Sequence, residues 1–354
     1  MLFDLTEDQQ DLQRLAKDYF AQRFPAGRLR AFWTGEDDDL GPVWRGLAEI
    51  GVLGLAIPEE HGGLGLGQFE FALVLEEAGY VALPSPLMET AAVAAPLIAR
   101  FGSDAQRAAW LEPIASGEAM VTIAIDGSGF AVWGRESDVV VALVDGDLHL
   151  VPSAMIEWTA LATDDEARRL AMASYHGIGP ETLLAAGPEG VKHALALARS
   201  ATAAALVGIS QRMLDMTVEY SLQRQQFGRV IGSFQALKHR MADMAVSVQS
   251  ARGLAWYSAY AQDHEPDMAD LAARTAKSAA AAAGYECGRN SLQLHGGIGF
   301  TFEYDLNFWL KRGRALEAAF GNASDQRVEI GRSVLREMRE DQISVENEEG
   351  VMSR

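Results

Sequence analysis

Two blocks of sequence decide how this chain is organised. The first is Gln223-Arg224-Gln225-Gln226-Phe227-Gly228, followed closely by Gly232-Ser233-Phe234-Gln235, and the second is Gln293-Leu294-His295-Gly296-Gly297-Ile298-Gly299-Phe300. Each block lies at an end of a long stretch with helical periodicity, and Gly296-Gly297 is a typical helix stop. We therefore expect the chain to turn between helices at both blocks.

Long amphipathic helices are predicted on both sides of the first block, because apolar residues recur there every three or four positions. The two apolar stripes consist of Leu206, Ile209, Met213, Met216 and Tyr220, and of Phe234, Leu237, Met241, Met244, Val248, Ala251 and Ala255. A third helix fits residues 269–294. Together they predict an antiparallel four-helix bundle over residues 186–338 that also packs against other subunits. The charged tail, residues 339–354, is expected to fray.

Residues 1–118 are predicted to form a helical domain. Thr6 and Gln9 make a capping-box signature, and apolar residues follow it at helical spacing. Further helices are expected over residues 43–50, 68–79, 86–101 and 104–115. The glycine-rich segment 58–67 must be a loop. It is not followed by the Lys-Ser/Thr pair of a nucleotide-binding loop, so we favour a connecting loop near a ligand.

Residues 119–185 differ in composition from both flanks. Val121-Thr122-Ile123-Ala124-Ile125 and residues 139–144 are rich in β-branched side chains, and Asp145-Gly146 separates the second run from Leu148-His149-Leu150-Val151. Asp-Gly between two apolar runs is a strong hairpin signal. The sequence thus predicts a mostly α fold with a small central β domain, which leaves little room for a large sheet.

The composition restricts the kinds of partner. Of 354 residues, 49 are acidic and 30 are Lys or Arg, which gives a net charge of -19. Such a charge repels nucleic acid and anionic membranes, so we expect neither a nucleic-acid partner nor membrane insertion. The single cysteine, Cys287, excludes an internal disulfide and a Cys-based zinc cluster, and the seven histidines show no metal-binding spacing. Because the N-terminus also lacks signal-peptide features, we expect a cytoplasmic protein without a metal site.

In order and spacing, these features resemble the acyl-CoA dehydrogenases. The resemblance rests on Arg-x-x-Phe-Gly, Phe-Gln and Gln-x-x-Gly-Gly in the blocks quoted above, and it covers nearly the whole chain. It is supported by Pro58-Glu59-Glu60-His61-Gly62-Gly63-Leu64-Gly65, by Leu75-Glu76-Glu77-Ala78-Gly79 and by the segment 199–244. The resemblance implies a helical N-terminal domain, a short β domain and a C-terminal four-helix bundle.

The resemblance also implies an activity, the flavin-dependent α,β-dehydrogenation of an acyl-CoA thioester. In the family, a carboxylate removes the α-proton while a hydride moves to FAD, and an electron-transfer acceptor then takes the electrons. The two blocks reach into a neighbouring subunit's FAD there. The resemblance therefore implies cofactor-binding roles for Arg224, Phe227, Gln235, Gln293, Gly296 and Gly297. From the residues alone, an ordinary surface cation at Arg224 and a simple helix stop at Gly296-Gly297 remain open.

The chain departs from the family at both known positions of the catalytic base. Phe320 stands, before Gly321, where the family's glutamate is expected, and a phenyl ring cannot accept a proton. The other position, before the arginine that Arg199 resembles, is Ala198. Glu317 lies one helical turn before Phe320 and is a candidate for a displaced base, although a surface glutamate is the commoner explanation.

The β domain departs from the family as well. The family's loops that hold the isoalloxazine ring are not found around residues 126–130 or 133–135. A basic cluster of Lys311, Arg312 and Arg314 either offsets local acids or contacts cofactor phosphates.

These departures suggest the non-catalytic subunit of a heteromeric acyl-CoA dehydrogenase, which helps to enclose an FAD shared with a homologous catalytic subunit. Heterotetrameric members of the family occur in the bacterial degradation of steroid side chains, so the resemblance points to a steroid side-chain CoA ester as a substrate. Three alternatives remain open: a homo-oligomeric dehydrogenase that uses Glu317, a non-enzymatic scaffold of the same fold, and a flavin-dependent oxygenase.

Overall fold

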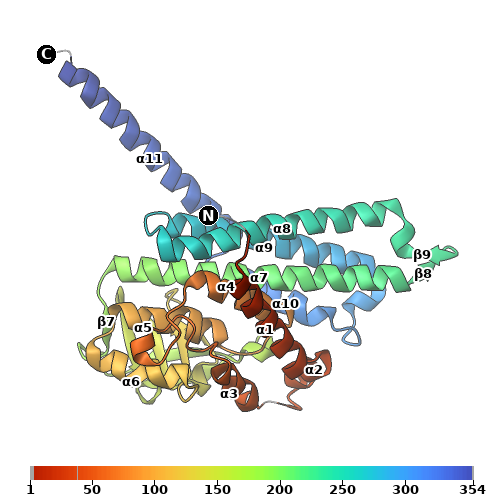
Figure 1. Cartoon of the computed structure of the whole chain (residues 1–354), viewed down its shortest axis with the longest axis horizontal. Coiled ribbons are helices and arrows are strands. Elements are labelled where there is room, and N and C mark those ends of the chain that lie inside the picture. Colours follow the sequence, from red (N-terminus) through yellow and green to blue (C-terminus); the bar gives the residue numbers. More distant parts are fainter. Residues whose placement is uncertain (1–3, 38, 353–354) are drawn as a thin grey trace.

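The computed structural model describes residues 4–37 and 39–352, and it arranges long helices above a layer of short helices and small sheets (Figure 1). The N-terminal part consists of α1 (Glu7–Arg23), α2 (Ala26–Thr34), α3 (Gly41–Glu49), η1 (Glu59–His61), α4 (Gln68–Tyr80), η2 (Met88–Ala94), α5 (Ala95–Phe101) and α6 (Asp104–Ala115). All the helices predicted in this part are confirmed. The predicted helix 86–101 is divided, because η2 is a π-helical turn that leads into α5. The helix α2 was not predicted.

The first helix begins as its sequence predicts. The side-chain oxygen of Thr6 accepts from the Gln9 amide at 3.3 Å, and the Gln9 side-chain oxygen accepts from the Thr6 amide at 3.0 Å. This reciprocal pair satisfies two of the backbone donors that a helix start leaves without intrahelical partners.

The β domain contains two small sheets rather than one. Among the described residues, β1 (Val121–Ala124), β3 (Val139–Val144), β4 (Asp147–Pro152) and β7 (Leu183–Ala185) form a four-stranded sheet, and β2 (Phe130–Val132), β6 (Leu170–Tyr175) and β5 (Ile156–Ala160) form a three-stranded one. The predicted hairpin is confirmed, since β3 and β4 pair antiparallel across Asp145 and Gly146, whose φ angles of 50° and 92° suit a tight turn. The strands β2, β5, β6 and β7 were not predicted.

The C-terminal part is the predicted helix bundle. It contains α7 (Pro188–Gln223), α8 (Gln235–His264), α9 (Ala269–His295), α10 (Leu306–Ala318) and α11 (Ala323–Met352). The short strands β8 (Gln225–Gln226) and β9 (Arg229–Val230) form a hairpin that projects where α7 and α8 meet (Figure 1). The two sequence blocks thus lie at one end of the bundle. The helix α11 points away from the body and includes most of the charged tail, while residues 353–354 lie outside the described residues.

The helix α7 is the core of the bundle. It has the length and apolar character of a membrane-spanning helix, but 89% of its most apolar window is buried inside the protein. The N-terminal domain packs closely against it, because Gly79 of α4 and Gly208 of α7 let the two backbones approach. A Cβ atom on Gly208 would lie only 1.8 Å from the backbone oxygen of Glu76.

The substitution Gly208→Ala tests this close packing. The added methyl group would force α4 away from α7, and overpacking of this kind typically costs about 1–3 kcal/mol. We therefore expect the melting temperature to fall by several degrees, as measured by circular dichroism.

Gly253→Ala on α8 is the matched control. No described atom lies within 4 Å of a Cβ atom built on Gly253. Because alanine favours the helix more than glycine does, this variant should melt at the wild-type temperature or above it. Equal losses in both variants would contradict the packing described here.

Candidate functional site

The residues of the two sequence blocks meet in one cavity, which we call the bundle-end pocket. Its volume is about 520 Å³, and it lies between the β8–β9 hairpin, the start of α8 and the end of α9. Of the six residues predicted to bind the cofactor, five line it: Arg224, Phe227, Gln293, Gly296 and Gly297. Gln235 is the first residue of α8 and is exposed, but it does not line the pocket.

The hairpin presents its aromatic tip to solvent. Phe227 and Gly228 form the turn with φ angles of 54° and 77°, and the Phe227 ring is 90% exposed. Its centroid lies 6.1 Å from that of Phe234 in an edge-to-face arrangement, and the Arg229 guanidinium lies 4.1 Å from the Phe234 ring centroid. A single exposed apolar side chain is common on protein surfaces, so the exposure of Phe227 does not by itself identify a binding surface.

The end of α9 offers backbone that a ligand can approach. Gly296 has a φ of 63°, and no described atom lies within 4 Å of a Cβ atom built on Gly296 or Gly297. Side chains at these positions would occupy the space that is now open, so the pocket wall there is bare backbone.

Nine further residues line the bundle-end pocket and were not predicted as site residues, among them Tyr220, Arg240 and His295. The His295 ring stacks on Tyr220 with a centroid distance of 4.6 Å, and burial lowers the pKa of His295, which keeps the ring neutral near pH 7. Arg240 on α8 adds a second cation beside Arg224. Tyr220 and His295 lay within the patterns already quoted, whereas Arg240 had no signal of its own. The pocket therefore combines two cations, four aromatic rings and open backbone.

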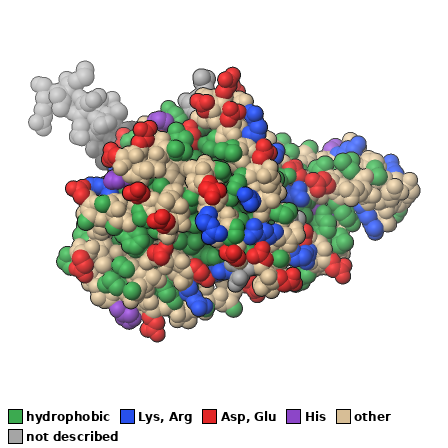
Figure 2. Space-filling model, turned by 60° about the horizontal axis from the view of Figure 1, so that its bottom comes forward, with side chains coloured by type: hydrophobic (Ala, Val, Ile, Leu, Met, Phe, Trp, Pro, Cys, Tyr) green, Lys and Arg blue, Asp and Glu red, His purple; other side chains and the backbone are tan. Residues whose placement is uncertain are grey.

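The charges around this pocket differ from the protein's overall charge. On the face in Figure 2, acidic and basic side chains are interspersed, and the projecting end of the bundle includes Lys and Arg side chains. A chain with a net charge of -19 thus places guanidinium groups where the bundle ends. Such a local concentration of cations is what an anionic ligand requires.

A second cavity, which we call the central cavity, lies between η2, the β domain and α10. Its volume is about 690 Å³, and Phe320 is part of its wall. Glu317 does not line it. The Glu317 carboxylate instead pairs with Arg314 at 2.6 Å, so the structure does not place it beside Phe320 in the cavity.

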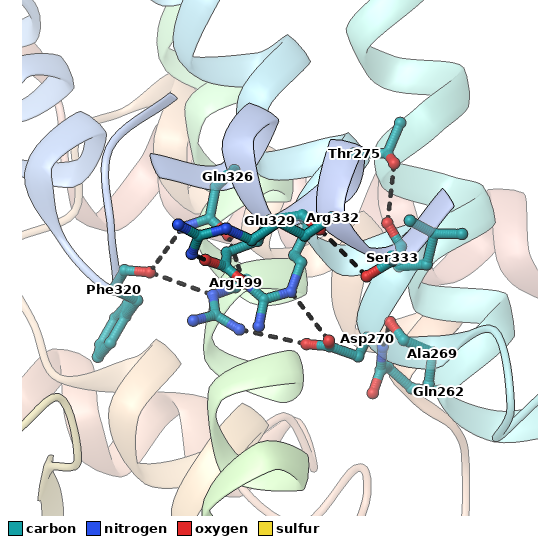
Figure 3. Close-up of polar contacts among 12 residues, drawn as sticks. Arg199, Gln262, Ala269, Asp270, Thr275, Phe320, Gln326, Glu329, Arg332 and Ser333 are labelled. Carbon is teal, nitrogen blue, oxygen red and sulfur yellow. Dashed lines mark hydrogen bonds and ion pairs between the residues drawn. The ribbon is translucent and has the colours of Figure 1, made fainter. Parts of the chain in front are cut away.

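The loop that carries Phe320 is held by buried donors (Figure 3). The Phe320 carbonyl oxygen accepts from Nε of Arg199 and from Nε2 of Gln326, both at 3.1 Å. The Lys277 ammonium, which is fully buried, donates to the carbonyls of Glu317 at 2.8 Å and Gly321 at 3.3 Å. Phe320 has a φ of 56°, which is uncommon for a bulky residue, so these donors impose a backbone conformation that costs energy.

The two cations have shifted pKa values for a common reason. Burial lowers the pKa of Lys277 to about 8 and that of Arg199 to about 10. The positive charge of Arg274 adds to the effect at Arg199, and Asp270, whose carboxylate lies 3.2 Å from Arg199, opposes it. The other position considered for a base, Ala198, is a buried methyl group.

The basic cluster on α10 mostly offsets local acids. Arg312 is buried and binds the Asp165 carboxylate as well as the Leu83 carbonyl oxygen, the latter at 2.8 Å. Arg314 pairs with Glu317, as described above. Lys311 lies over the ring of Phe302, 4.7 Å from its centroid. Of the two interpretations, the structure favours charge compensation.

In the β domain, the loop at residues 126–130 forms a hydrogen bond within itself, and Trp133 is buried. The Asp126 carboxylate accepts from the Ser128 amide at 3.0 Å, so this donor is used within the loop. Trp133 is buried rather than presented to the cavity, and it lies under the Arg169 guanidinium at 4.1 Å. Within the part of the chain that the structure describes, no group of three His, Cys, Asp or Glu side chains is arranged to hold a metal ion.

Known proteins share this architecture. The family model for the acyl-CoA dehydrogenase N-terminal domain matches residues 6–118, and the model for the acyl-CoA dehydrogenase C-terminal domain matches residues 186–335. The chain belongs to the acyl-CoA dehydrogenase family. The resemblance and the fold class inferred from the sequence are thereby confirmed.

Individual relatives cover almost the whole chain. Acyl-CoA dehydrogenase IpdE2 of Mycobacterium tuberculosis is 36% identical over 339 residues, which span 94% of this chain and 96% of that protein. The ChsE4-ChsE5 complex from the same organism has a chain that superposes with a TM-score of 0.88 at 28% identity, covering 95% of this chain and 99% of its own length. A chain of the Tcur3481-Tcur3483 steroid ACAD superposes with a TM-score of 0.85 at 29% identity. The match covers 94% of this chain and 99% of that one.

The pH dependence of stability tests the environment of Lys277. Its pKa is about 8 in the folded chain, against an ordinary value of 10.5. Between these values the unfolded chain binds more protons than the folded chain, so this group makes stability rise with pH. We expect the melting temperature of the wild type, relative to that of Lys277→Met, to increase from pH 8 to pH 10.5.

Lys238→Met, on the exposed side of α8, is the control for the charge change. Its melting temperature relative to the wild type should not vary with pH over the same range. If the melting temperature of the wild type minus that of Lys277→Met stays constant or falls between pH 8 and pH 10.5, the buried ammonium is not present as described.

Proposed function

We propose that this chain is the subunit of a heteromeric FAD-dependent acyl-CoA dehydrogenase that lacks the catalytic base. In this proposal it contributes its bundle-end pocket to a flavin site on a homologous catalytic subunit. One observation carries the proposal: the bundle-end pocket has the side chains and open backbone that fit part of FAD, whereas Phe320 occupies the central cavity where a base is needed.

The bundle-end pocket fits the adenosine diphosphate part of FAD. Arg224 and Arg240 would donate charge-assisted hydrogen bonds to the pyrophosphate, and the bare backbone at Gly296 and Gly297 would allow close approach. Phe227 offers an apolar surface at the exposed tip. FAD, when bound, supplies the acceptor for the hydride.

The central cavity supports dehydrogenation poorly. Removal of an α-proton needs a base within hydrogen-bonding reach of it, and Phe320 and Ala198 cannot serve. The alternative of a homo-oligomeric enzyme requires Glu317, whose carboxylate is paired with Arg314 and does not line the cavity. The β-domain loop at Asp126 uses its amide donor internally, which leaves less to hold an isoalloxazine ring.

The similar structures support a heteromeric assembly and a bulky substrate. One is a complex of two named proteins, and another is described as a steroid ACAD. We propose by analogy that the assembled enzyme desaturates a steroid side-chain CoA ester and passes the electrons to an electron-transfer acceptor. In a heterotetramer of this kind, the homologous subunit would supply the catalytic glutamate.

The substitution Arg224→Ala tests the shared flavin site. The complex is purified after co-expression with the homologous catalytic subunit, and its flavin content is measured from the visible spectrum after dialysis. Loss of a charge-assisted hydrogen bond costs about 1.5–3 kcal/mol, so we expect FAD affinity to fall at least tenfold.

Arg229→Ala is the matched control, because Arg229 lies on the hairpin that follows Arg224 but does not line the pocket. It should retain the wild-type flavin content. If Arg224→Ala retains its flavin as well, this chain does not contribute the bundle-end pocket to the cofactor.

A further inference from the structure

The last helix, α11, carries apolar side chains into solvent. It points away from the bundle and from the β8–β9 hairpin (Figure 1). Val328, Val334, Leu335 and Met338 of this helix are between 43% and 59% exposed. Unlike the single ring of Phe227, these side chains recur along one element at helical spacing, which is typical of a helix that packs against another molecule.

The first turns of α11 are fixed to the bundle. The Gln326 side chain is buried, and it donates to the Phe320 carbonyl at 3.1 Å and accepts from Nη1 of Arg274 at 3.3 Å. Figure 3 shows Gln326 beside Phe320 and the Arg199 guanidinium. These contacts hold the base of the helix, so they also fix the direction in which the rest of it leaves the body.

The apolar side chains of α11 lie on the face that is turned away from the bundle. Successive residues of a helix are about 100° apart around its axis. Val328 and Leu335 therefore lie opposite Gln326 and Ser333, which are less exposed, and Met338 borders the same face. We call Val328, Leu335 and Met338 the outer stripe.

The outer stripe has the spacing of a coiled-coil seam. Leu335 follows Val328 by seven residues, Met338 follows three residues later, and the sequence has Val345 seven residues after Met338. An apolar repeat of this kind is buried by packing against a second helix. A helix that projects from the body without such packing is only marginally stable. The last turns lie past residue 335, where the match to the family's C-terminal domain ends.

The charges of α11 indicate which helix packs there. Residues 327–339 contain four arginines and two glutamates, whereas residues 340–352 contain five acidic residues and neither Lys nor Arg. Two copies of α11 that run in the same direction would place the acidic halves side by side. Two copies that run antiparallel would place each basic half beside an acidic half, which electrostatics favours.

We propose that α11 pairs antiparallel with α11 of a second copy of this chain, through the outer stripe. In a pair centred near residue 340, position 335 of one copy lies opposite position 345 of the other. The paired segment, residues 328–352, is about 37 Å long, and the two bodies lie at its opposite ends. This contact uses neither the bundle-end pocket nor the flavin, so it does not depend on the proposed function.

Disulfide cross-linking of the full chain tests both the contact and its direction. Cys287, the one native cysteine, is buried, so introduced cysteines are the ones that react. Leu335→Cys and Val345→Cys are prepared separately, mixed, and oxidised with oxidised glutathione. A disulfide requires Cα atoms within about 7 Å, so we expect about tenfold more linked dimer in the mixture than in either variant alone.

Arg336→Cys provides the matched control. Arg336 is exposed and adjacent to Leu335, but it lies on a different face of α11. A mixture of Arg336→Cys with Val345→Cys should therefore give no more linked dimer than the single variants. Circular dichroism of each variant checks that the fold is retained.

Reversal of charge tests the reason for the antiparallel direction. Arg332→Glu and Arg339→Glu, both introduced into Leu335→Cys, place acidic residues beside the acidic half of the second copy. The yield of linked dimer with Val345→Cys should then fall several-fold. Arg332→Lys and Arg339→Lys in the same background retain the charge and should retain the yield.

Three results would overturn this proposal. In the first, Leu335→Cys alone links as well as the mixture does, which indicates parallel pairing or random collision. In the second, the mixture gives no more linked dimer than the Arg336→Cys control. In the third, the charge-reversed variant links as well as its lysine counterpart.

Discussion

Two buried cations hold the loop at the end of α10, and the shape of the central cavity depends on them. Lys277 and Arg199 donate to the carbonyl oxygens of Glu317, Phe320 and Gly321, so within this loop they bind backbone and not side chains. The loop can therefore keep its conformation whatever side chain stands at position 320. Replacing a proton-accepting carboxylate by a phenyl ring changes the chemistry of the cavity while the fold remains.

This arrangement separates two properties that a catalytic subunit would combine. The bundle-end pocket presents cations, aromatic faces and open backbone at the outer end of the bundle. The central cavity has a largely apolar wall that also includes Glu89 and Arg168. The first pocket opens at the projecting hairpin, whose tip Phe227 is almost fully exposed. The second is formed within one chain, between η2, the β domain and α10.

Much of the fold could be predicted from the sequence, because its signals are local. The capping box at Thr6 and the Asp145-Gly146 turn are each specified by a few adjacent residues. The stripes on α7 and α8 repeat over many turns, which made the bundle unambiguous. The strands β2 and β7 are only three residues long and carry too little periodicity to be recognised.

The site was predictable only where motifs mark it. Arg224 and Gln293 belong to such motifs, and they meet in one pocket, although their cofactor-binding roles remain predictions. Glu89 lies in a run that looks like any buried helix, and nothing in the sequence indicates a π-helical turn or an arginine from the β domain facing it. Proximity of residues so far apart in the sequence depends on tertiary structure, which no local pattern encodes.

The central claim is that this chain shares a flavin with a homologous subunit and does not hold one alone. The most direct measurement is the visible absorption spectrum of the chain purified alone and of the same chain co-purified with its nearest full-length homologue. The account predicts flavin absorption only in the co-purified complex. A stoichiometric flavin spectrum from the chain alone would contradict it, because the bundle-end pocket and the central cavity would then serve a cofactor that needs no second kind of subunit.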